Sequence, residues 1–214
     1  DGNKKGIIDR SGKMILEPEY DGIITSNSTD IILIKDEKFG NYNISSNKII
    51  QPKYKSILNP IGENLYLVYD GNYGLLDKEG NGLLPIEYNN IEFWSDSTVL
   101  VEKGSAFKVV DVYSQKIYHK FNSYKTLQNG DQKIIQVLSD DGIGILSNVF
   151  GMILKPNYDE IRMIDYDNKI YFNGRQSIEE AKLLVNLLVD DQGKIIINQA
   201  LNLDMEANFS CELN

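Results

Sequence analysis

The side chains that most often carry catalysis, histidine and cysteine, each occur only once in this sequence, as His119 and Cys211. A nucleophile–base pair or a zinc site draws on several such groups at matched positions. We interpret His119 as a half-exposed loop residue and Cys211 as a small hydrophobic side chain in a terminal strand. We therefore expect no enzyme activity, no metal and no cofactor, and a hydrolase with a single acid–base carboxylate is the least favoured alternative.

Three aspartates recur at equivalent places in the sequence: Asp9, Asp77 and Asp111. They could form a ring of carboxylates that binds cations. An aspartate before a tight turn can instead accept hydrogen bonds from the backbone two residues further on. Because Asn43 and Ser147 stand at the same place in other copies, we favour the turn interpretation.

The aromatic residues divide into a repeated set and an irregular set. One tyrosine recurs at an equivalent position, which predicts a repeated core contact: Tyr20, Tyr54, Tyr88 and Tyr158. The irregular set falls in the expected link between two units, where insertions often form a binding face. We predict that Trp94 anchors a ligand there, with four weaker candidates: Glu92, Phe93, Asp96 and the separate Tyr166.

A repeat must position these residues. Glycines follow one another at intervals of 34 residues, at Gly6, Gly40 and Gly74. In the third copy, the apolar run 65–69, an Asp-Gly pair and the run 73–77 predict a hairpin. A second turn and a third strand follow, and this strand ends near a proline, where pairing stops. The prolines near these strand ends are Pro18, Pro52, Pro85 and Pro156.

The sequence therefore predicts an all-β fold of about six antiparallel units in one domain. The units are expected at residues 1–30, 31–64, 65–97, 98–130, 131–168 and 169–204. Ser177 and Glu180 have the spacing of a helix capping box, so we expect one short helix near 177–184. Residues 205–214 could add a strand that closes the array like a propeller. The alternative is an open, twisted β-solenoid.

The charge of the chain limits its partners. Twenty-two basic and 31 acidic residues give a net charge of −9, which disfavours nucleic acids and anionic membrane surfaces. No apolar run approaches the roughly 20 residues of a membrane-spanning helix, and no signal peptide is evident.

The repeated pattern resembles the WG-type β-repeats of bacterial proteins: an aromatic residue, glycine, two hydrophobic residues and aspartate, then Pro-x-Tyr-Asp-x-Ile. The resemblance extends from about residue 3 to 161, although Phe39 or Tyr73 stands where that family has tryptophan. The fourth copy departs further, because Lys108 replaces the glycine. The resemblance implies a β-repeat scaffold, often secreted or at the cell surface, and no shared catalytic residues.

We expect a non-catalytic scaffold that presents variable links between units to a protein or peptide partner. The alternative is a module that binds carbohydrates or cell-envelope polymers through exposed aromatic rings.

Overall fold

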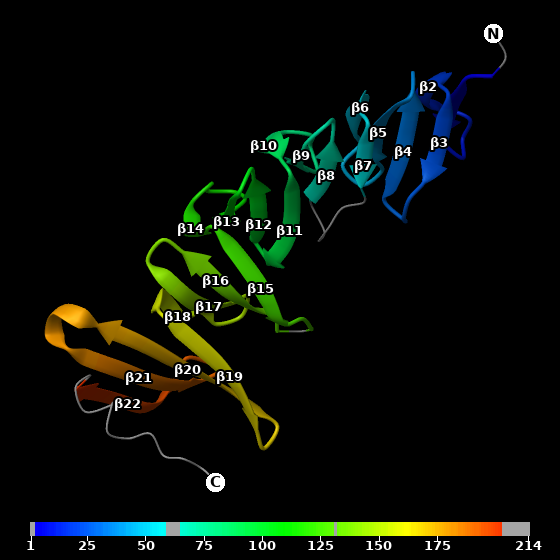
Figure 1. Cartoon of the computed structure of the whole chain (residues 1–214). Coiled ribbons are helices and arrows are strands. Elements are labelled where there is room, and N and C mark those ends of the chain that lie inside the picture. The colour runs from blue at the N-terminus through cyan, green and yellow to red at the C-terminus, as the bar shows by residue number, and fades with distance from the viewer. Residues whose placement is uncertain (1–2, 59–64, 131, 203–214) are drawn as a thin grey trace. The chain divides into compact units, whose positions relative to one another are not determined.

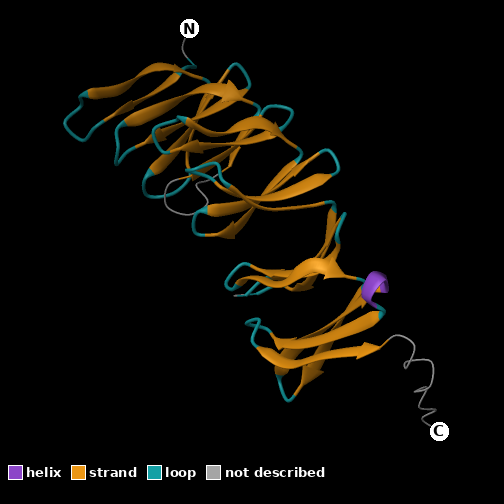
Figure 2. Cartoon of the chain, turned by 90° about the vertical axis from the view of Figure 1, so that its left-hand side faces the viewer, coloured by secondary structure: helices purple, strands orange, loops and turns teal. Residues whose placement is uncertain are grey.

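The structure is a computed structural model that describes residues 3–58, 65–130 and 132–202. These residues form six antiparallel sheets, as the sequence predicts, and none of the sheets closes on itself. Figure 2 shows strands throughout the described chain and a single short helical turn. No helix in the described ranges is long and apolar enough to cross a membrane.

Each sheet after the first is a meander of four strands that follow one another in the chain (Figure 1). The first sheet holds β1 (Lys5–Ile8) and β2 (Met14–Tyr20). The second holds β3 (Gly22–Thr25), β4 (Asp30–Lys35), β5 (Lys38–Asn43) and β6 (Lys48–Tyr54). The third holds β7 (Ser56–Leu58), β8 (Leu65–Tyr69), β9 (Tyr73–Asp77) and β10 (Gly82–Tyr88).

The remaining sheets repeat this order. The fourth holds β11 (Asn90–Ser95), β12 (Thr98–Lys103), β13 (Ala106–Asp111) and β14 (Ile117–Phe121). The fifth holds β15 (Ser123–Gln128), β16 (Ile134–Ser139), β17 (Gly142–Ser147) and β18 (Gly151–Tyr158). The sixth holds β19 (Glu160–Tyr166), β20 (Lys169–Ile178), β21 (Leu183–Asp190) and β22 (Ile195–Asn202).

The sheets begin one strand earlier than the predicted units. The segment after each Pro-x-Tyr run, expected as a tail, is the first strand of the next sheet; β3, for example, pairs with β4 through Ile23 and Leu33. A repeating sequence has no marked beginning, so the position of the sheet boundary depends on which strands pair in space. The expected link at residues 92–95 is consequently part of β11.

The described chain divides into two compact units. One unit contains the residues up to 104 together with 108–118, and the other contains residues 105–107 together with those from 119 onward. Each unit has its own core between successive sheets. In the first, Leu33 and Leu75 are fully buried, and in the second Ile145 and Phe172 are.

The repeated tyrosines occupy these cores, as the sequence predicts. Tyr20, Tyr54 and Tyr158 are buried, and the partly buried Tyr88 packs against the cluster of the third and fourth sheets. This confirms that the repeated aromatic is a packing residue and leaves it unavailable for a ligand.

The repeated glycine and the repeated proline belong to one local structure. In the second sheet Phe39 pairs with Tyr54 and Asn41 with Ile50, so β6 has two more residues than β5 over this stretch. The extra residues around Pro52 form a bulge that passes close to Gly40. A Cβ atom at Gly40 would lie 2.3 Å from the carbonyl oxygen of Ile50. The same contact would be 2.5 Å at Gly6 and 2.8 Å at Gly144.

The helix expected near residues 177–184 is reduced to one 3-10 turn, Glu179–Ala181. Ser177 does not cap it, because this residue lies in β20 and pairs with Leu184 of β21. The β20–β21 hairpin extends up to this turn. Residues 177, 178, 183 and 184 are therefore paired as strands and cannot form a helix. The strand proposed for residues 205–214, and Cys211 within it, lie outside the described residues.

Candidate functional site

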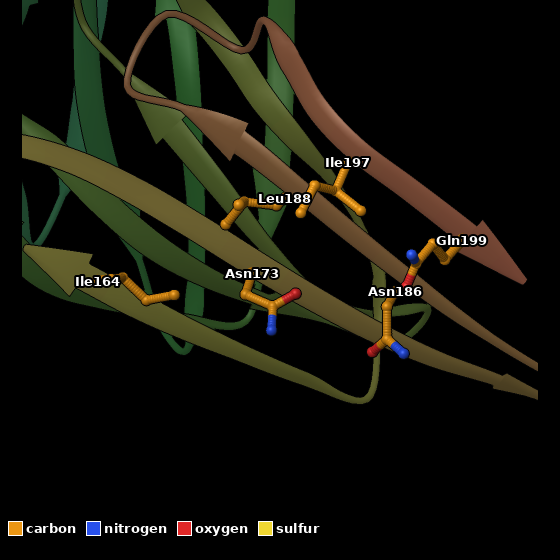
Figure 3. Close-up of a pocket in the computed structure, with 6 residues that line it drawn as sticks. All are labelled: Ile164, Asn173, Asn186, Leu188, Ile197 and Gln199. Atoms are coloured by element: carbon orange, nitrogen blue, oxygen red, sulfur yellow. The ribbon is translucent and has the colours of Figure 1, made fainter. Parts of the chain in front are cut away.

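A shallow hollow of about 310 Å³ lies on one face of the sixth sheet (Figure 3). All four strands of the sheet contribute to its lining: Ile164 from β19, Asn173 from β20, Asn186 and Leu188 from β21, and Ile197 and Gln199 from β22. Three of these side chains are aliphatic and three are amides. We call the face that carries them the outer face of the sixth sheet.

The strand register explains why these side chains gather. Leu188 pairs with Asn173 on one side and with Ile197 on the other, and Asn186 pairs with Gln199. Paired residues project to the same face of a sheet, and neighbours along a strand project to opposite faces. Phe172, next to Asn173, is fully buried in the core of the second compact unit, so the hollow lies on the opposite face.

The outer face keeps apolar groups in contact with water. Ile164 is 40% exposed and Ile197 is 44% exposed. Within the described residues no hydrogen bond engages the side-chain amides of Asn173, Asn186 or Gln199. A half-exposed apolar surface whose amides can donate and accept hydrogen bonds is suited to bind a ligand that has both apolar groups and hydrogen-bonding groups.

The residues that the sequence suggested as a ligand anchor lie elsewhere. Trp94 is in β11 and is only 5% exposed, so its ring has no open face to offer. Phe93 packs against the core of the third and fourth sheets, Glu92 is partly exposed, and Asp96 is exposed in the β11–β12 turn. Tyr166 is 72% exposed at the end of β19, in the other compact unit.

The sequence reasoning missed the amides of the outer face. The available signal was the composition of residues 195–202, IIINQALN, which contains only aliphatic and amide side chains and carries no charge. The strand itself was expected only from its first residues, because the repeat pattern is weak in the sixth unit.

The recurrent aspartates stabilise turns, as the sequence indicates. Asp9 Oδ1 accepts hydrogen bonds from the backbone N–H groups of Ser11 and Lys13, at 2.8 and 3.0 Å. Asp77 accepts them in the same way, and Asp111 accepts one from the backbone of Ser114 at 2.8 Å. The hydrogen bonds from the Ser114 backbone and from the Ser97 and Ser114 hydroxyls lower the pKa of the Asp111 carboxyl to about 2.

One prediction follows for the β9–β10 turn. Asp77→Ala removes the acceptor of the backbone N–H groups of Glu79 and Asn81, which lie at 2.9 and 2.8 Å. We expect a loss of about 1 kcal/mol in the free energy of unfolding, measured by urea denaturation. Asp77→Asn keeps an acceptor oxygen and should recover most of this loss. Equal losses in the two variants would contradict the turn assignment.

A buried polar cluster joins the second and third sheets. The Tyr66 hydroxyl donates a hydrogen bond to Asp30, and the amides of Asn41 and Asn43 donate to the same carboxylate at 2.9 and 3.0 Å. Asp30 is only 2% exposed. A substrate cannot reach a carboxylate at this depth, so the cluster is structural.

The charge of this cluster follows from its hydrogen bonds. Burial alone would raise the pKa of Asp30, but the hydrogen bonds from Tyr66, Asn41, Asn43 and Thr29 outweigh it and lower the pKa. Burial and the neighbouring carboxylate raise the pKa of Tyr66, which therefore remains protonated and keeps donating.

His119 lies in strand β14 and not in a loop. Burial lowers its pKa, so the imidazole is neutral at physiological pH. Among the described residues there is no group of histidine, cysteine or acidic side chains arranged to hold a metal ion.

Comparison with solved structures finds similarity to proteins of different kinds. Dihydro-heme d1 dehydrogenase NirN in complex with DHE is 11% identical, with a TM-score of 0.33 and coverage of 84% of this chain and 46% of that one. A eukaryotic initiation factor is 8% identical, with a TM-score of 0.39 and coverage of 90% and 60%. Hsv2 of Kluyveromyces lactis is 12% identical, with a TM-score of 0.31 and coverage of 82% and 61%.

The chain thus spans about half to three fifths of the length of these structures. No curated protein matches the sequence at a significant level. The profile of the family described as "WG containing repeat" matches two segments, residues 6–35 and 73–105. Both segments contain a repeated glycine, at Gly6 and Gly74, whose close approach to the following proline-bearing strand is seen in the fold. Residues 6–35 and 73–105 therefore match the WG-containing repeat, the family that the repeated sequence pattern resembles.

Proposed function

We propose that this protein is a non-catalytic binding module that holds a segment of a partner protein on the outer face of its sixth sheet. The observation that carries the proposal is the hollow lined by three aliphatic and three amide side chains. We further propose that the partner segment is uncharged, with aliphatic side chains that fill the hollow and backbone groups that bond to the amides.

The chemistry of the lining supports a protein segment as the ligand. An amide side chain offers both a donor and an acceptor, which matches the backbone N–H and C=O groups of an extended chain. Ile164, Leu188 and Ile197 offer apolar contact, and none of the described residues that line the hollow is charged. Exposed apolar surface with a polar surround is typical of protein interaction sites.

The two alternatives lack comparable support. Sugars are commonly held against an exposed aromatic ring, but the lining residues in the described part of the chain include no aromatic side chain, and Trp94 is buried. A hydrolase needs an acid, a base or a nucleophile at the site. The lining residues contain none of these groups.

A peptide library displayed on phage and selected against the purified full chain tests the proposal. We expect enrichment of uncharged peptides rich in aliphatic residues. Asn186→Lys places a charged side chain in the lining of the hollow and should weaken the binding of a synthetic selected peptide at least tenfold, or by about 1.4 kcal/mol. Fluorescence anisotropy with a labelled peptide measures this change.

Ile24→Lys is the matched control, because Ile24 is an exposed strand residue of the second sheet, outside the hollow. It should bind the peptide as tightly as the unmodified protein does. Thermal unfolding of both variants checks that they remain folded. Failure to enrich any peptide, or equal affinity for Asn186→Lys and Ile24→Lys, would contradict the proposal.

A further inference from the structure

The last strand of each sheet has one edge that is not paired within that sheet. In five sheets this strand contains a proline or a lysine that interferes with further pairing: Pro18 in β2, Pro52 in β6, Pro85 in β10, Lys120 in β14 and Pro156 in β18. Strand β22, Ile195–Asn202, contains neither proline nor any charged residue. Prolines and charges on edge strands prevent association with other chains.

The geometry of β22 also differs from that of the other last strands. In the fifth sheet, Ile143 pairs with Tyr158 and Ile145 with Leu154, so β18 bulges around Pro156 opposite Gly144. In the sixth sheet, the pairing of β21 with β22 is regular from Leu183 and Asn202 to Leu188 and Ile197. All eight residues of β22 are exposed. The strand therefore offers a regular row of backbone groups along an edge that pairs with no other described strand.

We infer that β22 pairs edge to edge with β22 of a second copy of this chain. The two strands would run antiparallel about a two-fold axis and would join two sixth sheets into one sheet of eight strands. This inference goes beyond the proposed function, because it needs no other partner. A two-fold interface uses the same surface on both copies, so the surface must complement itself.

Charge favours a second copy at this strand over other places on the surface. Each chain carries a net charge of −9, so two copies repel each other over much of their surfaces. An uncharged strand opposes no like charges when it meets its own copy. The other edge of the sixth sheet, β19, carries Glu160, Arg162 and Asp165 and lacks this property.

On the face that carries the hollow, the sequence of β22 complements itself when the axis passes through Gln199. Gln199 then lies opposite Gln199 of the second copy, and Ile197 lies opposite Leu201. These pairs place amide against amide and aliphatic against aliphatic, which are favourable combinations across antiparallel strands. Paired residues share a face, so the outer faces of the two copies would lie on the same side of the joined sheet.

Sedimentation velocity of the full chain tests this inference over concentrations from roughly 1 to 200 µM. An edge of eight residues makes a small interface, so we expect a reversible dimer with a dissociation constant on the order of 10–100 µM. The dimer would have twice the 24.3 kDa mass of the chain. A protein that remains a monomer throughout this range would overturn the inference.

Two variants place the contact. Gln199→Lys puts two like charges opposite each other at the axis and should weaken the dimer at least tenfold. Asn186→Lys is the matched control, because Asn186 pairs with Gln199 on the same face but lies one strand away from the edge. It should leave the dimer unchanged. An equal loss of dimer affinity in both variants would indicate association through the outer face. A dimer that persists in Gln199→Lys would indicate association through another surface. Either result overturns edge pairing.

The same variants separate this inference from the proposed function. Peptide binding is judged by Asn186→Lys in the anisotropy experiment, and dimer formation by Gln199→Lys in the sedimentation experiment. A monomer whose binding of selected peptides is weakened by Asn186→Lys would overturn the second copy as occupant while supporting the proposed function. A dimer that enriches no peptide would support the second copy as occupant and contradict the proposed function.

Discussion

Replacing Gly40 by alanine is expected to lower the free energy of unfolding by about 3 kcal/mol, since it forces an atom into an occupied space. The new Cβ would lie 2.3 Å from the carbonyl oxygen of Ile50 and 2.6 Å from the nitrogen of Pro52. Both neighbours are backbone atoms, so no side chain can rotate away. The bulge of β6 around Pro52 would have to move off β5.

Gly82→Ala is the matched control for this experiment. Gly82 is also a strand glycine, and a Cβ atom there would meet nothing within 4 Å. Its replacement should change stability little, or raise it slightly by restricting the unfolded chain. Urea denaturation of both variants at the same pH provides the comparison. Equal stabilities would show that the bulge tolerates a side chain and would refute the assigned role of the repeated glycine.

The second large effect is expected for Tyr66→Phe, which should lower the free energy of unfolding by about 2 kcal/mol. The change removes the hydroxyl that donates to Asp30 and also accepts from the amide of Asn41 at 2.9 Å. A buried charged group that loses a donor costs more than an ordinary hydrogen bond. Tyr113→Phe is the control, because Tyr113 is exposed and its hydroxyl makes no hydrogen bond within the described residues.

The effect of Tyr66→Phe should depend on pH. Hydrogen bonds hold the pKa of Asp30 below its ordinary value of 3.8 in the folded protein. This contribution to stability is complete above the unfolded-state value and is lost as pH falls through 3.8 and then through the folded pKa. The stability difference between the protein and the variant should therefore shrink under acidic conditions. A difference that stays constant from pH 7 to roughly pH 2.5 would contradict the assigned charge of Asp30.

Much of the fold was predictable because its signals are local. The glycines at intervals of 34 residues and the turns between apolar runs predict antiparallel β-units, and the structure has them. Asp9 and Asp77 bond to backbone groups within four residues, so sequence alone could identify their role. The repeated tyrosines were predictable for a related reason, since repetition of one residue implies repetition of one contact.

The candidate site was not predictable in this way. Residues 92–96 were assigned to a variable link because the repeat pattern fades there, but the pairing of β11 with β12 makes most of them a strand and buries Trp94. The prediction of a short helix near 177–184 was wrong for the same reason, because residues with the local capping pattern pair as strands in the β20–β21 hairpin. In both places the outcome depended on which distant strand was available for pairing.

The sequence by itself determined the all-β class, the repeat, the turns and the excess of negative charge, because these depend on composition and on neighbours in the chain. Only the tertiary structure decided the boundaries of the sheets, the contact of Asp30 with Tyr66, 36 residues away, and the face on which three amides meet three aliphatic side chains. Those features follow from strand register across a sheet and from packing between sheets. Both are set by the folded chain as a whole, since a shift of one residue in register moves every side chain to the opposite face.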